Sequence, residues 1–318
     1  MHVYRGAVTA LSFSLLVTLT PLASPAADKG LAWDSVTKIA ANADASSLQP
    51  GSFDADYATA AAAPPPSTGG GGFLGKYKQM MASAQNVEQM MQSGLAERHY
   101  VAGMKVRTDE VAQQTATIVD CTARTVTTLD LKAKTYKVVP MESPSGPPSG
   151  ESGNAGPGPN RDNNSRVSIS VTNTALGSRE VGGQPTNGFR SDVTFTETDS
   201  SGQSRTQNGN LLGYYSTYAD PSATCSRFGA GVAGGARGME MMAGYARLMR
   251  ALATSGDPRF SVTQSGPPLP LGKLAMYSAM TFTAQTRQVT MVSERGNVRP
   301  IADSDPIFSV PSDFTQEK

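Results

Sequence analysis

The sequence predicts a mainly β domain that carries two amphipathic helices, an export signal and two long segments without a core. Short stretches rich in β-branched residues follow one another about every ten residues, as in an antiparallel meander. Two methionine-containing stretches repeat apolar residues at the i, i+3 and i+4 spacing of a helix. The chain of 318 residues contains 32 Gly and 21 Pro, which indicates long loops or linkers.

Residues 1–26 have the pattern of a secretory signal peptide. Arg5 precedes an apolar stretch over 7–22, and the small-residue site Ser24-Pro25-Ala26 follows. This run is shorter than the roughly 20 apolar residues of a transmembrane helix. We therefore expect a periplasmic, soluble mature protein without a membrane-spanning segment.

Residues 27–72 are predicted to form a low-complexity, flexible arm. A short helix is expected over 31–39, with the single tryptophan, Trp33, either docked on the body or exposed. The prolines of 64–66 and the glycines of 69–72 are typical of a flexible tether.

The folded domain is predicted to span 73–318. An amphipathic helix is expected over 77–91, closed by Gly94, and a second one over 239–254. A disordered insertion is expected over 142–166, which is rich in Pro, Gly and Ser. The predicted strands cover 96–101, 104–108, 115–121, 125–131, 135–140, 167–171, 176–181, 189–197, 210–217, 274–284, 288–294 and 307–310.

Turn residues separate these strands. Gly182-Gly183 and Asn187-Gly188 are expected at turns, the second pair as a hairpin. Asp120 and Asp130 are also expected to mark turns, because a short carboxylate accepts hydrogen bonds from nearby backbone amides.

The element order and several segments resemble the periplasmic lipoprotein carriers of the LolA/LolB type, and more closely their uncharacterised exported relatives. The resembling segments are 100–107, 118–120, 128–137, 177–183 and 308–314. The resemblance implies a half-barrel, in which a curved antiparallel sheet packs around helices. It also implies carriage of a lipid or lipidated polypeptide, without a catalytic residue.

Cys121 and Cys225, the only cysteines, are expected to form a disulfide, because the compartment is oxidising. The bridge would close a loop of about 105 residues, which the chain-entropy model values at roughly 4 to 5 kcal/mol. Two buried free thiols are the alternative.

The methionines of the two predicted helices suggest a ligand groove. Their adaptable side chains suit core packing, an apolar groove for acyl chains, or copper(I) binding by thioethers, and all three interpretations stay open. The candidate groove residues are Tyr77, Met80, Met81, Met91, Met239, Met242 and Met249.

Other chemistry has little support in the sequence. His99 is the single histidine after residue 26, and no nucleophile-elbow motif lies near it, so we predict no enzyme and no metal site. Residues 229–234 match the GxGxxG pattern but lack the preceding buried strand of a dinucleotide site, so no cofactor is expected.

The net charge of the chain also limits the classes of partner that we expect. There are 27 basic and 26 acidic residues, and loss of Arg5 with the signal leaves 26 of each. A neutral chain is not expected to bind nucleic acid. We predict a non-catalytic protein that binds a hydrophobic ligand. The alternative is an envelope protein–protein interaction module, such as a sensor or assembly factor.

Overall fold

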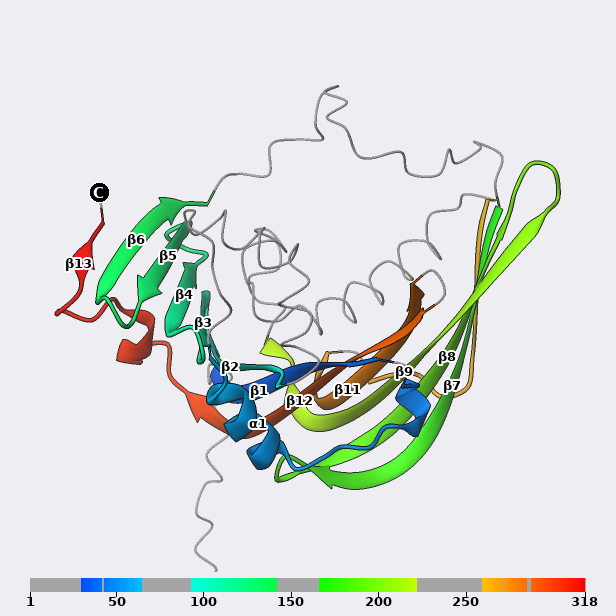
Figure 1. Cartoon of the computed structure of the whole chain (residues 1–318), viewed down its shortest axis with the longest axis horizontal. Helices are drawn as coiled ribbons and strands as arrows, with labels where there is room; N and C mark the ends of the chain where they lie inside the picture. Colours follow the sequence, from blue (N-terminus) through cyan, green and yellow to red (C-terminus); the bar gives the residue numbers. More distant parts are fainter. Residues whose placement is uncertain are drawn as a thin grey trace, which may run out of the picture.

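A computed structural model describes residues 30–41, 43–64, 93–141, 166–221, 259–270, 272–284 and 287–317. They form one curved sheet of 13 strands in the order β10-β7-β8-β9-β11-β12-β1-β2-β3-β4-β5-β6-β13, and the sheet is open between β10 and β13 (Figure 1). The strands are β1 (Gly30–Ala41), β2 (Leu95–Ala102), β3 (Lys105–Glu110), β4 (Thr115–Asp120), β5 (Thr125–Asp130), β6 (Thr135–Pro140), β7 (Arg166–Val181), β8 (Gln184–Thr198), β9 (Ser204–Ala219), β10 (Phe260–Ser265), β11 (Lys273–Ala284), β12 (Arg287–Ile301) and β13 (Thr315–Gln316).

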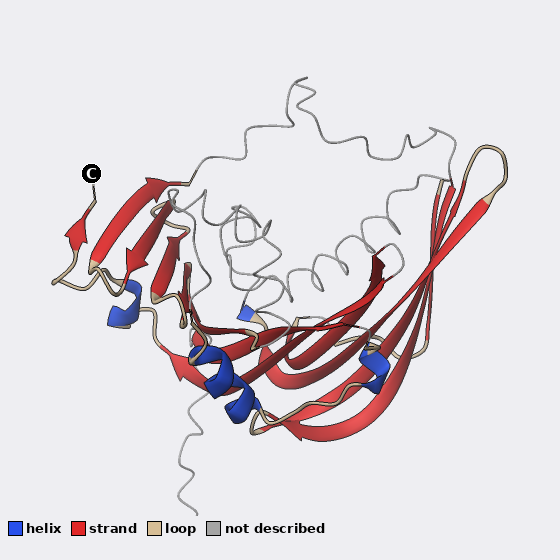
Figure 2. Ribbon diagram, in the orientation of Figure 1, coloured by secondary structure: helices blue, strands red, loops and turns tan. Residues whose placement is uncertain are grey.

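The mainly β class is confirmed, but the prediction of two amphipathic helices packed on the sheet is wrong for the described residues. Their one α-helix is α1 (Phe53–Ala61), accompanied by the 3₁₀ turns η1 (Ala45–Ser47) and η4 (Pro306–Phe308) (Figure 2). The stretches 77–91 and 239–254 lie outside the described residues. The sheet is also not wholly antiparallel, because the edge strands β10 and β13 run parallel to β7 and β6.

The prediction of a flexible N-terminal arm is also wrong, because β1 is a central strand of the sheet. It pairs antiparallel with β12 on one side and with β2 on the other. Trp33, expected on a short helix, is 2% exposed within this strand. A strand with strands on both sides and both faces covered loses the polar–apolar alternation by which strands are recognised.

The meander of β2 to β6 follows the prediction closely, and a ten-residue repeat sets its turns. Asp120 Oδ1 accepts hydrogen bonds from the amides of Thr122 (2.9 Å) and Ala123 (2.8 Å). Asp130 Oδ1 does the same for Lys132 (3.0 Å) and Ala133 (2.7 Å). The prediction that both aspartates mark turns is confirmed.

The turns of the longer strands β7 to β9 agree only in part with the prediction. Gly182-Gly183 joins β7 to β8 as expected, but Asn187-Gly188 lies inside β8 and makes no hairpin. A Cβ atom at Gly188 would meet the Tyr214 ring at 2.6 Å, so this glycine serves side-chain packing. Residues 307–310, expected as a strand, belong in part to η4, which Asp305 caps through the Ile307 amide.

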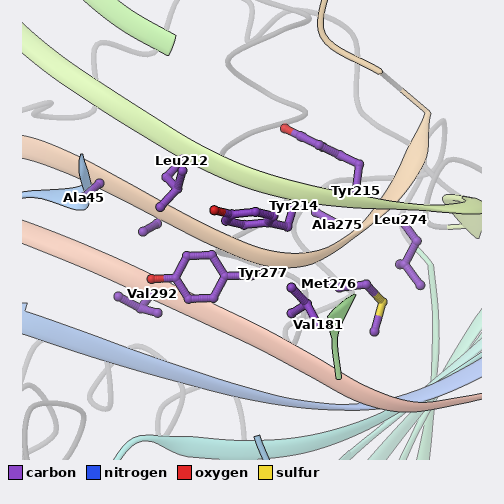
Figure 3. Close-up of a cluster of buried hydrophobic side chains, with 11 residues drawn as sticks. Ala45, Val181, Leu212, Tyr214, Tyr215, Leu274, Ala275, Met276, Tyr277 and Val292 are labelled. Atoms are coloured by element: carbon purple, nitrogen blue, oxygen red, sulfur yellow. The ribbon is translucent and has the colours of Figure 1, made fainter. Parts of the chain in front are cut away.

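The described helices all pack on one face of the sheet, which is the convex face in Figure 1. Phe53 and Ala60 of α1 pack on Val36 and Ala96, while Ile307 and Phe308 of η4 pack around Tyr100. η1 inserts Ala45 into the largest apolar cluster, with Leu212, Tyr214 and Tyr277 (Figure 3). Among the described residues, no helix is long and apolar enough to cross a bilayer.

Candidate functional site

The pairing of the strands divides the side chains of β1 between two faces. Val36 faces α1 and pairs with Glu294 and Ala96, so these side chains share the convex face. Trp33 and Ser35 alternate with Val36 along the strand and therefore point to the opposite, concave face. We call the concave side of β12, β1 and β2 to β6 the inner face.

An apolar row crosses the inner face from β1 to β6. Each member is the direct cross-strand partner of the next, so the side chains touch in sequence. The members of this apolar row are Leu31, Val101, Val106, Val119, Val126 and Val139. All are buried or half-buried except Val139, which is 38% exposed at the β6 end.

Polar rows lie beside the apolar row on the same face. Two residues further along β1, Trp33 pairs with His99, which pairs with Thr108. Ser35, two residues beyond Trp33 on β1, has Arg295 of β12 and Glu97 of β2 as its cross-strand partners. Because two residues span about 7 Å of strand, the inner face changes from apolar to charged over about 14 Å.

His99 is held by three neighbours inside the sheet. Its Nε2 lies 2.8 Å from Ser35 Oγ and its Nδ1 lies 3.5 Å from Thr108 Oγ1. The imidazole also stacks on the Trp33 indole, with ring centroids 5.1 Å apart. These contacts fix the ring in a closely packed, fully interior position.

The electrostatics of this cluster favour neutral forms of its acid and base. Burial raises the pKa of Glu97 to about 8, against an opposing effect of Arg295. Burial, and then Arg295, lower the pKa of His99 to about 3. Although Nε2 of His99 lies 3.5 Å from Glu97 Oε2, both groups are uncharged at neutral pH, so this contact is no ion pair. Burial, followed by repulsion from Glu97, raises the pKa of Glu110 to about 7.

Arg295 is the exception, because its charge is kept inside the protein. Arg295 is 3% exposed, and burial lowers its pKa only to about 10. The guanidinium Cζ lies 5.1 Å from the centroid of the Trp33 indole. Arg295 Nε, Arg295 Nη1 and Trp33 Nε1 are all buried without a hydrogen-bond partner. Three donors without acceptors therefore gather in two touching side chains.

An open pocket of about 510 Å³ lies on the other side of β1 and contrasts with the inner face. Its polar groups are partnered within the protein. Asp34 accepts a hydrogen bond from Asn297 (2.9 Å), and Arg98 donates one to Tyr57 (3.1 Å). The guanidinium of Arg299 lies over the Tyr100 ring. None of the buried polar atoms without a hydrogen-bond partner among the described residues belongs to this pocket.

The residues predicted for a ligand groove, Tyr77, Met80, Met81, Met91, Met239, Met242 and Met249, all lie outside the described residues. Cys121 is buried directly after β4, and no described cysteine is a free thiol. Cys225 lies outside the described residues, so the Cys121–Cys225 pairing stays a prediction.

Two observations on the described residues bear on the chemistry of the inner face. An imidazole whose pKa is about 3 is a weak base at neutral pH, so the contact of His99 with Ser35 does not resemble an activated nucleophile. Within the described ranges, no group of three His, Cys, Asp or Glu side chains could hold a metal ion.

Sequence reasoning missed Arg295. It lies in the run Ser293-Glu294-Arg295-Gly296, where local composition suggests an exposed hairpin arm. Alternation along β12 could have given a signal, since Glu294 and Arg295 must point to opposite faces. No protein-family model matches the chain, and a search of curated proteins finds no similar sequence.

Proposed function

We propose that this chain is a non-catalytic periplasmic protein that binds a hydrophobic ligand, such as a lipid or a lipidated polypeptide, on the inner face of its sheet. The apolar row from Leu31 to Val139 is the observation that carries the proposal. A continuous apolar strip suits an acyl chain lying across the strands, because burial of apolar surface drives such binding.

None of the described helices packs on the inner face. α1, η1 and η4, the described helices, pack on the convex face and leave their apolar residues there. The resemblance to periplasmic lipoprotein carriers leads to the same proposal. A non-catalytic role agrees with a histidine that burial keeps neutral.

Burial of the apolar row sets a condition on ligand entry. Val101 and Val119 are each 4% exposed, so the middle of the row offers a ligand little accessible surface. Val139 lies at the accessible end of the row, on β6. Uptake is therefore expected to begin from that end.

The single tryptophan provides the test, because Trp33 lies beside the apolar row. Delipidated full-length protein would be titrated with stearate and with 9,10-dibromostearate, and Trp33 emission and heat of binding recorded. We expect saturable binding of both, with quenching by the brominated chain alone. If calorimetry and fluorescence both detect no binding, the proposed function is wrong.

Two neighbouring valines offer a matched control. Val139 ends the apolar row and Val138 points to the convex face, with exposed fractions of 38% and 39%. Val139→Asn is expected to weaken stearate binding about three- to ten-fold, since it removes apolar contact area. Val138→Asn makes the same change on the opposite face, and its affinity should equal that of the wild type.

The alternative function, a protein–protein module, has one structural feature in its favour. Within the described ranges, the sheet ends at β10, a six-residue strand paired on one side with β7. An unpaired strand edge is a template for β-strand addition by a partner. Co-purification of one stoichiometric protein, with no ligand bound and no stearate binding, would favour this function.

A further inference from the structure

The unmet donors of Arg295 and Trp33 require an explanation that the fold alone does not give. Buried donors normally find acceptors, and a buried cation without a partner is strongly unfavourable. Here the guanidinium contributes two such donors and the adjacent indole contributes one. The two side chains touch, with 5.1 Å between Cζ and the ring centroid.

The neighbouring acids do not neutralise Arg295. None of the ion pairs among the described residues includes it. Asp220, and then Glu97, act on its charge through space, without a hydrogen bond or ion pair to it among the described residues. Glu97 is protonated at neutral pH because of its burial. The inner face therefore holds a buried guanidinium that has no contact ion pair among the described residues, and two of its nitrogens, with the adjacent indole nitrogen, have no acceptor.

We infer that Arg295 and Trp33 form the head-group site for an anionic amphiphile, whose apolar chain lies on the row from Leu31 to Val139. This inference rests on the proposed function and adds the chemical class of the ligand. The row that holds Arg295 lies about 14 Å along the strands from the apolar row, within the reach of a long acyl chain.

The chemistry of the donors selects an oxyanion. A guanidinium presents parallel N–H groups that match two oxygens of a carboxylate or phosphate, and the indole N–H supplies a further donor. A fatty acid, a lysophospholipid with a terminal phosphate and a free inorganic anion share this chemistry. The apolar row favours the first two over the third.

The experiment compares ligands with the same C18 chain and different head groups, and small anions without a chain. Binding to delipidated full-length protein is measured by isothermal titration calorimetry. Stearate and stearyl alcohol share one chain, while stearoyl lysophosphatidic acid carries a phosphate. Acetate and inorganic phosphate test the anion without a chain. The variants are Arg295→Met, which removes the charge at similar volume, and Arg295→Lys, which keeps it. Arg98→Met is the matched control, since Arg98 lies on the convex face with its side chain 49% exposed.

For the wild type, we expect stearate or the lysophospholipid to bind at least ten-fold more tightly than stearyl alcohol. Arg295→Met should abolish this preference and leave stearyl alcohol binding unchanged. Arg295→Lys should keep part of the preference, and Arg98→Met all of it. The tighter of the two anionic ligands identifies the head group as carboxylate or phosphate.

Other outcomes separate this inference from the proposed function. Equal binding of stearate and stearyl alcohol by wild type and Arg295→Met would overturn the head-group site but leave hydrophobic binding intact. Tight binding of acetate or phosphate alone, with no gain from the chain, would overturn the amphiphile and indicate a small-anion site. No binding of any probe would reject both proposals.

Discussion

The buried guanidinium of Arg295 lies over the indole of Trp33, with 5.1 Å between Cζ and the ring centroid, and Arg295 Nε, Arg295 Nη1 and Trp33 Nε1 have no hydrogen-bond acceptor. The two residues come from β12 and β1, more than half the chain apart in sequence. A cation–π contact offsets part of the desolvation of a guanidinium. It supplies no hydrogen-bond acceptor, so the donors remain unmet.

Arg295→Met is expected to stabilise the ligand-free protein by about 1 to 3 kcal/mol, because an apolar side chain of similar volume replaces a buried charge. The change leaves no unbalanced charge on Glu97, because this acid is already protonated at neutral pH. Urea unfolding of delipidated wild type and variant measures the difference. A loss of stability instead would show that Arg295 has a structural acceptor, and the head-group site would lose its basis.

Glu97→Gln tests the electrostatics of the same cluster. Burial raises the pKa of Glu97 from 4.5 to about 8, so the folded state holds a proton that the unfolded state releases within this window. Wild-type stability should therefore decrease as pH rises from about 4.5 to about 8, by a few kcal/mol from this group. The glutamine variant lacks this loss.

The measured quantity is the difference in unfolding free energy between Glu97→Gln and wild type at several pH values, in which the other titrating groups largely cancel. This difference should grow in favour of the variant from pH 5 to pH 8. A difference independent of pH would mean that Glu97 is ionised in the folded protein and pairs with Arg295. Asp303→Asn, a change at an exposed carboxylate, is the control.

The aspartate turns of the meander can be tested separately. Asp130→Ala removes the acceptor of two backbone amides, at 3.0 and 2.7 Å, and should destabilise the protein by about 1 kcal/mol. Asp130→Asn keeps an acceptor and should recover most of the loss. Thermal unfolding of both variants gives the comparison, and equal stability of the alanine variant and wild type would contradict the role of the carboxylate.

These turns also explain why the meander could be predicted from the sequence. The units that end in Asp120 and Asp130 each contain their own strand, capping Asp and turn, so local chemistry determines local structure. Gln114, Arg124 and Lys134 adopt positive φ at the ends of successive turns, so one geometry repeats.

β1 shows where local reasoning fails. Its partners lie at 95–102 and 287–301, and nothing within residues 30–41 indicates these distant strands. The inner face could not be predicted for the same reason. Arg295, Ser35 and Glu97 become neighbours only through the pairing of three remote strands, so the candidate site depends on register, which local composition does not encode.

The predicted disulfide between Cys121 and Cys225 is tested by intact mass and by alkylation. Cys121 is buried beside Val119, Val126 and Met141, next to the apolar row, and its amide donates to Met104 O at 2.9 Å. If Cys121 pairs with Cys225, the intact mass of the unreduced protein is two hydrogens below that of the reduced chain. Reduction should then destabilise the protein by about 2 to 5 kcal/mol.

Alkylation in denaturant without reductant tests the alternative, because labelling of both cysteines would show that the thiols are free. The double variant Cys121→Ala with Cys225→Ala controls for the reductant, whose addition should leave its stability unchanged.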